Sequence, residues 1–500
     1  MQVKTQLDEL QNYLVDASNM KGGFAQKLFV PDTTDEIPQI LREANQQKIP
    51  VTISGARTGT VGGAIPFGGY IISLEKLNKI KEINKDKMTA VVEPGVILGD
   101  FQKAVAAANL FYPPDPTEWS CQVGGTVATN ASGARSFKYG STRDYVNRLK
   151  IVLANGDVLD LKRGDCLAEI NGIEVKTMQG NAVRAKLPTY RRPNVRKNVS
   201  GYFCGENVDA IDLFIGSEGT LGVIIQIEFA LLPKPEGFFS GIVFFKDHGD
   251  LLNFVVAVRE ISFQSRNARV TLFDSVLLEY FDENALKFIT ETFPEVPAGV
   301  AGAVFFEQEM RAETEDGLLE QWNELLEKHG ADLERSWFTT NETDREKMRE
   351  FRHALPVSVN ERVVRNRQKK IGTDMAVPDA NFSGFLRFYK ETLNASGLDY
   401  VIFGHIGDNH LHANILPKND IEAEKARHLY GRFIAQAIML GGTVSAEHGI
   451  GKLKSKYLQV MMGERYINEM AELKRAFDPK GILGRGNMLD EKVLEIAHFR

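Results

Sequence analysis

The sequence predicts an α+β protein of two or three domains, and two patterns carry this prediction. In the first half, strand-like apolar runs alternate with segments of helical spacing. In the second half, apolar strands lie between long charged helices, which is typical of helices packed on an antiparallel sheet. The chain has 500 residues, too many for one hydrophobic core, and its 43% hydrophobic and 25% charged residues are ordinary for a folded enzyme.

The expected elements of the first half follow one another up to residue 235. Residues 1–28 are expected to be an N-terminal helical segment, because residues 1–20 have amphipathic spacing and no apolar signal core. Then follow a helix at 35–47, strands at 48–54 and 70–77, a strand, Pro-Gly turn and helix at 89–110, and an Asn-Gly hairpin at 149–162. A glycine-punctuated strand at 212–235 closes with two prolines, and the main domain boundary is placed there.

The second half is expected to hold an antiparallel sheet covered by helices. Strands are predicted at 240–247 and 301–309, and helices at 313–330 and 422–442, the last one stopped by glycine. Residues 400–417 are predicted to form two strands around a tight turn. This domain should span residues 236–470, and residues 471–500 should form a C-terminal segment.

Composition excludes several classes of function. A net charge of -6 argues against nucleic-acid binding, which usually requires a basic face. No apolar run reaches the roughly 18 residues of a membrane span. Cys121, Cys166 and Cys204 lack metal-type spacing and suit a reducing compartment. We therefore expect a cytoplasmic protein, and the sequence leaves open a homodimer and peripheral attachment to the inner face of the membrane.

Three segments rich in small residues are candidates for ligand binding. Residues 54–66 hold four glycines after a predicted strand, but they match neither the Walker A motif nor GxGxxG. Taken alone, this segment fits a phosphate-binding loop and a plain turn equally well. Residues 113–146 are dense in Gly, Ser, Thr and Asn and too long for a mere connection. Residues 216–224 add a third such turn.

A second signal is a concentration of histidine. His405, His410 and His412 are three of the nine histidines in the chain, and they stand within eight positions. Neutral imidazoles suit Zn, Mn or Fe, and Glu447 could complete a ligand set, with the adjacent His448 pointing elsewhere. The spacing alone does not decide which histidines form the ligand pair.

The three small-residue segments, in this order, resemble the flavin-binding domain of the vanillyl-alcohol oxidase / p-cresol methylhydroxylase superfamily. The resemblance implies two α/β subdomains over residues 29–235 with FAD between them, and a return of residues 471–500 to this domain. Cys121 and Gln122 depart from the pattern. The first half contains no histidine, so we expect non-covalent FAD, barring linkage through cysteine. The implied FAD-binding residues are Gly55, Ala56, Arg57, Thr58, Gly59, Asp115, Pro116, Gly124, Gly125, Asn130, Ser132, Gly133, Gly140, Glu218, Gly219, Val223 and Ile224.

The histidine segment and residues 441–452 resemble the C-terminal domain of FAD-linked D-2-hydroxyacid dehydrogenases, which include D-lactate and D-2-hydroxyglutarate dehydrogenases and the flavin subunit of glycolate oxidase. The resemblance implies that His405, His412 and Glu447 bind one divalent metal ion, with Zn first and Mn or Fe next. His448 resembles the catalytic base, and Asn414 resembles a substrate contact. Asn409 and His410 depart from the motif, so His410 is expected not to bind the metal directly. Residues 481–489 also depart from it.

These expectations combine into a hydroxyacid dehydrogenase. The substrate is expected to be a small D-2-hydroxyacid, with D-lactate first, that loses a hydride to flavin N5 and its hydroxyl proton to His448. Arg352 matches the position of a carboxylate-binding arginine, although a basic helical face is the plain alternative. The electron acceptor could be a quinone, an electron-transfer flavoprotein, a cytochrome or a partner subunit. Alternatives are an oxidase of the same fold, a D-2-hydroxyglutarate or glycolate dehydrogenase, and a redox-neutral enzyme like alkyl-glycerone-phosphate synthase.

Overall fold

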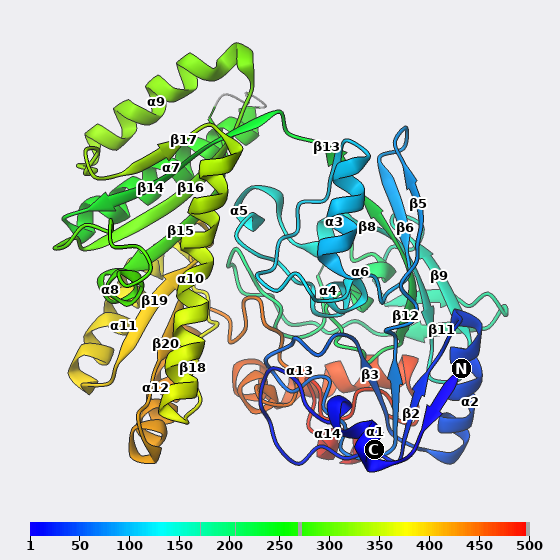
Figure 1. Ribbon diagram of the computed structural model, residues 1–500. Coiled ribbons are helices and arrows are strands. Elements are labelled where there is room, and N and C mark those ends of the chain that lie inside the picture. Colours follow the sequence, from blue (N-terminus) through cyan, green and yellow to red (C-terminus); the bar gives the residue numbers. More distant parts are fainter. Residues whose placement is uncertain (171, 206, 269–272, 497–500) are drawn as a thin grey trace.

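The computed structural model, which describes residues 1–170, 172–205, 207–268 and 273–496, consists of two halves that face each other (Figure 1). One half contains the N-terminal strands, and the other contains a seven-stranded sheet whose first strand in the chain begins at Gly237. Both halves mix helices with sheets, and the second sheet is antiparallel throughout. The predicted α+β class is confirmed.

The first half is built on two main sheets with short helices between them. The four-stranded sheet runs β1 (Gln2–Lys4), β2 (Lys27–Val30), β4 (Tyr70–Ser73), β3 (Val51–Ser54), with β2, β4 and β3 parallel. The five-stranded antiparallel sheet runs β5 (Ile80–Asn84), β6 (Thr89–Val92), β12 (Val223–Ala230), β8 (Val146–Val152), β9 (Val158–Lys162). Two small pairs are β10 (Ile173–Lys176) with β11 (Ala182–Ala185) and β7 (Leu110–Phe111) with β13 (Leu232–Pro233). The helices are α1 (Leu7–Leu10), α2 (Ile37–Gln47), α3 (Leu98–Ala107), α4 (Val123–Thr129), α5 (Ser136–Tyr139) and α6 (Ala210–Phe214), with 3-10 turns η1 (Gln11–Tyr13), η2 (Thr34–Glu36) and η3 (Thr142–Tyr145).

The second half is one sheet between helices. Its strand order is β17 (Trp337–Thr339), β14 (Gly237–Phe245), β16 (Gly302–Met310), β15 (Ser275–Asp282), β19 (Tyr400–Gly404), β20 (His412–Ile415), β18 (Ile371–Gly372). The helices are α7 (His248–Ala268), α8 (Glu283–Ile289), α9 (Glu315–Lys328), α10 (Glu342–Asn366), α11 (Phe382–Ser396) and α12 (Asp420–Met439), with 3-10 turns η4 (Ala312–Thr314), η5 (Asp379–Asn381) and η6 (Ile406–Asp408).

Both faces of the seven-stranded sheet are buried, which explains why its strands are apolar on both sides. Ile242 and Phe244 pack in one hydrophobic cluster together with residues of α8 and α10. Val243 and Phe245 pack in another cluster with residues of α7, α9, α11 and α12. Because side chains alternate along a strand, β14 supplies both clusters in turn. The side of the sheet that faces α10 is therefore mainly apolar, and a buried ionisable side chain there is unusual.

The C-terminal residues return to the first half. Helices α13 (Ser455–Phe477) and α14 (Glu491–Ile496) lie in the lower part of the first half in Figure 1, to the left of strands β3 and β2. Between them, the N–H of Val51 in β3 donates to the carbonyl of Ile482 at 2.7 Å, and the N–H of Gly484 donates to the carbonyl of Val51 at 2.9 Å. Residues 482–484 thus extend the edge of the first sheet.

The N-terminal segment departs from the expected helix. Residues 2–4 form strand β1, which pairs with β2, and helical structure is confined to Leu7–Leu10 and Gln11–Tyr13. Strand pairing outweighs the amphipathic spacing here, because the sheet offers β1 a complete antiparallel register.

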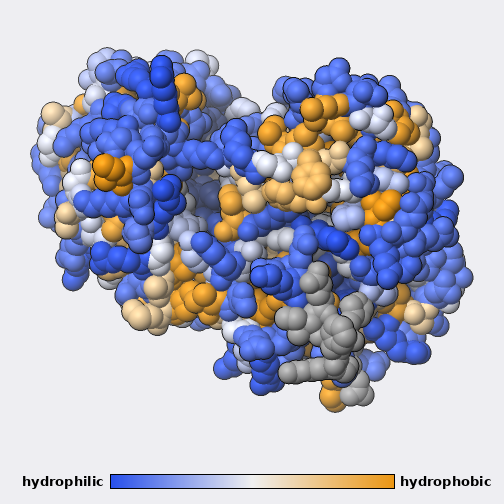
Figure 2. Space-filling model, turned by 90° about the horizontal axis from the view of Figure 1, so that it is seen from below, coloured by the Kyte–Doolittle hydropathy of each residue, from blue (hydrophilic) through white to orange (hydrophobic). Residues whose placement is uncertain are grey.

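The surface seen from below is largely hydrophilic, with scattered apolar side chains and a notch between the two halves (Figure 2). Within the described ranges, no helix combines the length and the apolar character needed to cross a bilayer.

Candidate active site

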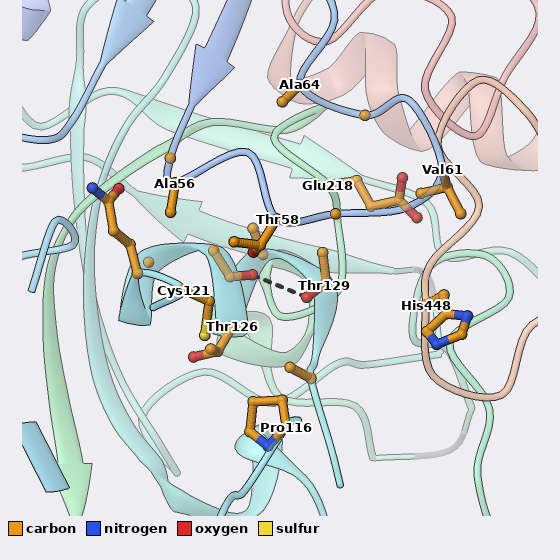
Figure 3. A pocket seen from close by; sticks show the side chains of 18 of the residues that line it. Ala56, Thr58, Val61, Ala64, Pro116, Cys121, Thr126, Thr129, Glu218 and His448 are labelled. Carbon is orange, nitrogen blue, oxygen red and sulfur yellow. Dashed lines mark hydrogen bonds between the residues drawn. The ribbon is translucent and has the colours of Figure 1, made fainter. Parts of the chain in front are cut away.

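A cavity of about 390 Å³ lies between the two halves, within the roughly 300–1,000 Å³ usual for ligand sites. Loop 54–64, the segment 116–132 with α4, and residues 217–224 form most of its wall. The second half contributes His405, His412, Glu447 and His448. Figure 3 shows His448 at one end of this cavity and Ala56 and Cys121 toward the other. Segments far apart in the sequence therefore build a single site.

Glycines shape the wall of this cavity in two ways. At Gly125 an added Cβ would meet no atom within 4 Å, so this face of α4 opens onto the cavity. At Gly124 a Cβ would lie 2.5 Å from Cβ of Pro94, so this position allows close packing. Glycine thus serves ligand access at one position and internal packing at its neighbour.

Twelve of the predicted FAD-binding residues line the cavity, and five do not. Those on the wall are Gly55, Ala56, Arg57, Thr58, Gly59, Pro116, Gly124, Gly125, Ser132, Glu218, Gly219 and Ile224. The others are Asp115, Asn130, Gly133, Gly140 and Val223. They have structural contacts instead: Asn130 ends α4 with φ of 49°, Gly140 ends α5 with φ of 77°, and Val223 is buried in β12.

Gly133 and Asp115, two of these five residues, pack against each other. A Cβ at Gly133 would lie 1.9 Å from the carbonyl oxygen of Asp115, which only glycine avoids. The motif match therefore includes residues that shape the loops as well as residues that face the cavity.

Glu218 joins the two halves. Its carboxylate accepts hydrogen bonds from the backbone N–H groups of Ile450 and Gly451, both at 2.6 Å. Asn487 donates to the carbonyl of Glu218 at 3.2 Å and also lines the cavity. The loop that carries Glu447 and His448 is thereby fixed to the wall formed by the first half. Asn487 was not predicted, because it lies in the segment 481–489 that departs from the family motif.

Four side chains from the second half converge at the edge of the cavity. The candidate ligand atoms of His405, His410, His412 and Glu447 all lie within 4.8 Å of one another. Glu447 Oε2 is 3.1 Å from His405 Nε2 and 3.7 Å from His410 Nδ1. Turn η6, which Asn409 closes with φ of 54°, brings His405 back toward His412. The structure places His410 in the group as well, and the expectation that it does not bind the metal directly stays a prediction.

Each histidine also contacts an acceptor behind it. His405 donates from Nδ1 to Glu279 Oε1 at 2.5 Å, and His412 donates from Nδ1 to the carbonyl of Thr373 at 3.0 Å. His410 Nε2 lies 3.0 Å from Asp374 Oδ1. Acceptors of this kind orient imidazoles in metal sites.

Three buried ionisable residues of the site were missed in the sequence. Glu279 is a charged residue in the interior of an apolar strand that is buried on both faces, which was an available signal. Asp374 accepts from the backbone N–H groups of Glu447 and His448, each at 3.1 Å. The ammonium of Lys197 lies 3.9 Å from Glu447 Oε2. Asp374 and Lys197 stand in unremarkable polar sequence, so their role depends on contacts with distant segments.

The pKa shifts of Glu447 and His412 favour the protonation states that bind a metal, whereas the pKa of His405 is raised, because the charge of Glu279 outweighs the effect of burial. Burial alone would raise the pKa of Glu447, but the charges of Lys197 and His405 hold it well below its ordinary value. Burial, reinforced by the neighbouring imidazoles of His410 and His448, lowers the pKa of His412 well below its ordinary value. An ionised carboxylate and a neutral imidazole are the forms that bind a cation. The donor set therefore fits a divalent metal ion.

The predicted catalytic residues surround this cluster at different depths. His448 lines the cavity, its side chain is 38% exposed, and its ring stacks on that of His412 at 5.1 Å. Asn414 is buried two residues after His412 on β20, where both point to the α10 side of the sheet. Arg352 on α10 does not line the cavity, and its Nε donates to Glu279 Oε2 at 2.9 Å.

A glycine-lined cavity fixed to a cluster of histidines and a carboxylate defines the class as a cofactor-dependent enzyme, and the comparisons specify the cofactor. The family model described as "FAD binding domain" matches residues 25–162. The model described as "FAD linked oxidases, C-terminal domain" matches residues 265–488. The chain belongs to the FAD-linked D-2-hydroxyacid dehydrogenase family, and it is an FAD-dependent oxidoreductase that acts on CH–OH groups.

Similar proteins agree with this assignment along nearly the whole chain. A D-lactate dehydrogenase from Anaerostipes hadrus is 30% identical over 470 residues, covering 91% of this chain and 88% of that one. The glycolate oxidase subunit GlcD of Bacillus subtilis is 29% identical over 488 residues, covering 95% and 91%. A D-2-hydroxyglutarate dehydrogenase from Xanthomonas citri is 28% identical over 501 residues, covering 98% and 94%.

Solved structures share the fold. p-Cresol methylhydroxylase superposes with a TM-score of 0.71 at 17% identity, covering 98% of this chain and 94% of that one. An alkyldihydroxyacetonephosphate synthase superposes with a TM-score of 0.66 at 16% identity, covering 97% and 82%. At such identities the likeness concerns the fold alone.

Proposed function

We propose that this enzyme oxidises a small D-2-hydroxyacid, with D-lactate first, to the 2-oxoacid at the end of the cavity near His448. The observation that carries the proposal is that FAD-binding loops and the His405, His412 and Glu447 cluster border one cavity. The relatives named for D-lactate, glycolate and D-2-hydroxyglutarate differ in what lies beyond the hydroxyacid carbon. The compounds in all three names are 2-hydroxyacids, and the hydroxyl and carboxylate of a 2-hydroxyacid are the groups that this arrangement suits.

Two groups complete the chemistry. Bound FAD would accept the hydride from the substrate carbon, and the open face at Gly125 supports its place against α4. A divalent ion, Zn first and Mn or Fe next, would lower the pKa of the substrate hydroxyl. We assign this ion to His405, His412 and Glu447, because their donor atoms converge. The Nδ1 atoms of His405 and His412 are held by hydrogen bonds, which leaves Nε2 of each ring for the ion.

His448 is our candidate for the base that removes the hydroxyl proton. Burial in the cavity wall lowers its pKa, although the charge of Asp374 acts the other way, so the imidazole is neutral at pH 7 and can accept a proton. Asp374 Oδ2 lies 3.7 Å from its Nδ1 and also accepts from its backbone N–H. Asp374 thus positions the ring without touching the substrate.

Arg352 and Asn414 are assigned to the substrate. One edge of the Arg352 guanidinium is held by Glu279, which also accepts from His405, so this carboxylate fixes a cation and a metal-ligand candidate relative to each other. A guanidinium held in this way suits a substrate carboxylate. Asn414 shares its side of β20 with His412 and can offer an amide to a polar substrate group.

The test is a panel of D- and L-hydroxyacids mixed anaerobically with the enzyme while the flavin absorbance near 450 nm is followed. Fixed positions for hydroxyl, carboxylate and hydride define one handedness, so we expect bleaching by D-lactate and not by L-lactate. Equal bleaching by both would contradict the proposal. An absence of bleaching by any hydroxyacid would favour a redox-neutral reaction, and rapid reoxidation by oxygen during turnover would favour an oxidase.

We further propose that FAD is bound non-covalently. Residues 1–247 contain no histidine, and Cys121, which lines the cavity, has a thiol whose pKa burial raises to about 12, so its reactive thiolate is disfavoured. Acid precipitation should leave the yellow colour in the supernatant. Colour retained in the pellet would show a covalent link.

Electron transfer from the reduced flavin to a quinone, an electron-transfer flavoprotein, a cytochrome or a partner subunit completes our proposal. We place this reaction in the cytoplasm or on the inner face of its membrane. The three cysteines, all free, suit a reducing compartment. Assays with quinone analogues and cytochrome c separate these acceptors.

A further inference from the structure

We propose that His410 is a fourth protein ligand of the divalent ion, so that this enzyme holds its metal with three histidines and one glutamate. The inference rests on the metal site of the proposed function and goes beyond its three assigned ligands. It concerns the position where this sequence departs from the family motif.

The first argument is a buried ring nitrogen without a partner. His410 is fully buried, and its Nε2 lies 3.0 Å from Asp374 Oδ1, but its Nδ1 makes no hydrogen bond within the described residues. A buried polar atom that lacks a partner is costly, and such atoms are rare in folded proteins. A metal ion at Nδ1 would satisfy the atom that faces the cluster.

The second argument is a common orientation of the three imidazoles. In each ring one nitrogen is turned to an acceptor on the far side: Glu279 for His405, Thr373 for His412 and Asp374 for His410. For His405 and His410 the other nitrogen is turned to Glu447 Oε2. His410 therefore has the same arrangement of acceptor, imidazole and cluster as His405, with Asp374 in the place of Glu279.

The third argument is distance. Nitrogen and oxygen ligands about 2.0–2.2 Å from one ion lie about 3.0–3.5 Å apart, for tetrahedral and octahedral angles alike. The distances from Glu447 Oε2 to His405 Nε2 and to His410 Nδ1 are 3.1 Å and 3.7 Å. His410 Nδ1 is thus within a few tenths of an ångström of a ligand position, and a small rotation of the ring suffices to reach it.

A fourth protein ligand changes which ion suits the site. Four protein ligands complete the tetrahedral shell that Zn²⁺ prefers, so a substrate hydroxyl would have to be a fifth ligand. Mn²⁺ and Fe²⁺ accept five or six ligands readily with nitrogen and oxygen donors. The four-ligand set therefore favours Mn²⁺ or Fe²⁺ over the Zn²⁺ that three ligands suggest.

The experiment compares the full-length FAD-bound enzyme with His410→Asn, His412→Ala and the matched control His428→Asn, which alters an exposed histidine on α12. Each protein is treated with a chelator and titrated with Mn²⁺, with affinity measured by EPR. Pulsed EPR then counts the coordinated imidazole nitrogens. Retained flavin absorbance and circular dichroism show that each variant is folded.

We expect three coupled imidazoles in the unaltered protein and two in His410→Asn, with Mn²⁺ affinity reduced by more than about 100-fold, beyond the 10–100-fold that loss of an orienting contact costs. An unchanged nitrogen count in His410→Asn would overturn the inference and leave His410 as a residue that positions Asp374. Absence of Mn²⁺ binding by the unaltered protein would overturn both this inference and the metal part of the proposed function. Three imidazoles with no hydroxyacid turnover would support His410 and contradict the proposed function alone.

Discussion

The two halves of the molecule border the same cavity with opposite kinds of wall. The first half presents glycines, threonines, alanines and backbone, with few charges. The second half presents three imidazoles and a carboxylate, supported from behind by Glu279, Asp374 and Lys197. The difference shows two ways to build a site: one wall depends on where atoms are missing, and the other depends on specific donor atoms.

The two walls should therefore fail differently when altered. Added volume is damaging in the first half, because it occupies space that the cofactor needs. Removal of a donor is damaging in the second half, because its supporting partners are left in place around an incomplete site. Three predictions test this contrast, and a fourth concerns a buried carboxylate of the second half away from the cavity.

The largest effect is expected from Gly125→Leu. The new side chain meets no protein atom within 4 Å at its Cβ and extends into the cavity, so the variant should fold and remain nearly colourless. Without FAD its turnover should be undetectable. Gly317→Leu is the matched control, because Gly317 also stands in a helix with open space at its Cβ, in α9 away from the cavity. The measurement is flavin absorbance per mole of folded protein. A Gly125→Leu variant that keeps its yellow colour would show that added volume on this wall does not prevent FAD binding.

Next in size is His412→Ala. Loss of one donor should empty the metal site, and turnover should fall at least about 10³-fold, since a catalytic ion contributes several kcal/mol to the transition state. FAD should stay bound, because its binding depends on the other wall. Elemental analysis and flavin absorbance are measured on the same sample, with His428→Ala as control. Loss of flavin together with metal would show that the two walls are not independent.

A smaller loss is expected from His448→Gln, which replaces the proposed base by a neutral side chain of similar size. The rate of flavin reduction by D-lactate should fall by about 10²–10⁴-fold, the usual contribution of a general base. Metal content and flavin absorbance should be unchanged. Stopped-flow reduction at saturating substrate separates this chemical defect from weaker binding. A rate within about threefold of the unaltered enzyme would assign the proton to another group.

The smallest effect on activity is expected at a buried carboxylate of the second half that does not face the cavity. Burial raises the pKa of Asp282, which caps α8 by accepting from Ala285 N–H at 2.7 Å, to about 7. Between about pH 4 and pH 7 the folded protein holds a proton that the unfolded chain releases, so the free energy of unfolding falls as pH rises. Asp282→Asn keeps a capping oxygen and removes this dependence.

We therefore expect Asp282→Asn to be more stable than the unaltered protein by about 4 kcal/mol at pH 8, with little difference at pH 4. Urea denaturation at the two pH values measures this, and activity should be preserved. An equal shift at both pH values would show that packing, rather than the buried charge, sets the difference.

The sequence predicts those parts of each wall that a local pattern of residues marks. Loop 54–64 and the histidine turn were located because local spacing marks them: glycines after a strand in the first case, and three imidazoles around a tight turn in the second. The alternation of strands and helices was also local, and α2, β3, β4, α3 and the β8–β9 hairpin lie where it predicts them.

What the sequence could not show depends on contacts between distant segments. Glu279 reaches His405 from 126 positions away, and Ser132 donates to Glu447 across 315 positions at 3.1 Å. No local pattern encodes such meetings. The expected N-terminal helix failed for the same reason, because the strand partner of Gln2–Lys4 lies at Leu28–Val30. Motif matching also cannot separate a residue such as Asn130, which ends a helix, from one such as Gly125, which faces the cavity.

The hydrogen bonds between Val51 and residues 482–484 have a consequence for how the protein is made. At a synthesis rate of about 5–20 residues per second, the ribosome produces Val51 tens of seconds before Ile482. For that interval the outer edge of β3 lacks its final partner and is open to pairing with other chains. Asn487, a part of the cavity wall, emerges later still. The cavity wall is complete only once Asn487 has left the ribosome, so we expect FAD to bind late in synthesis, after the loops of the first half have been made.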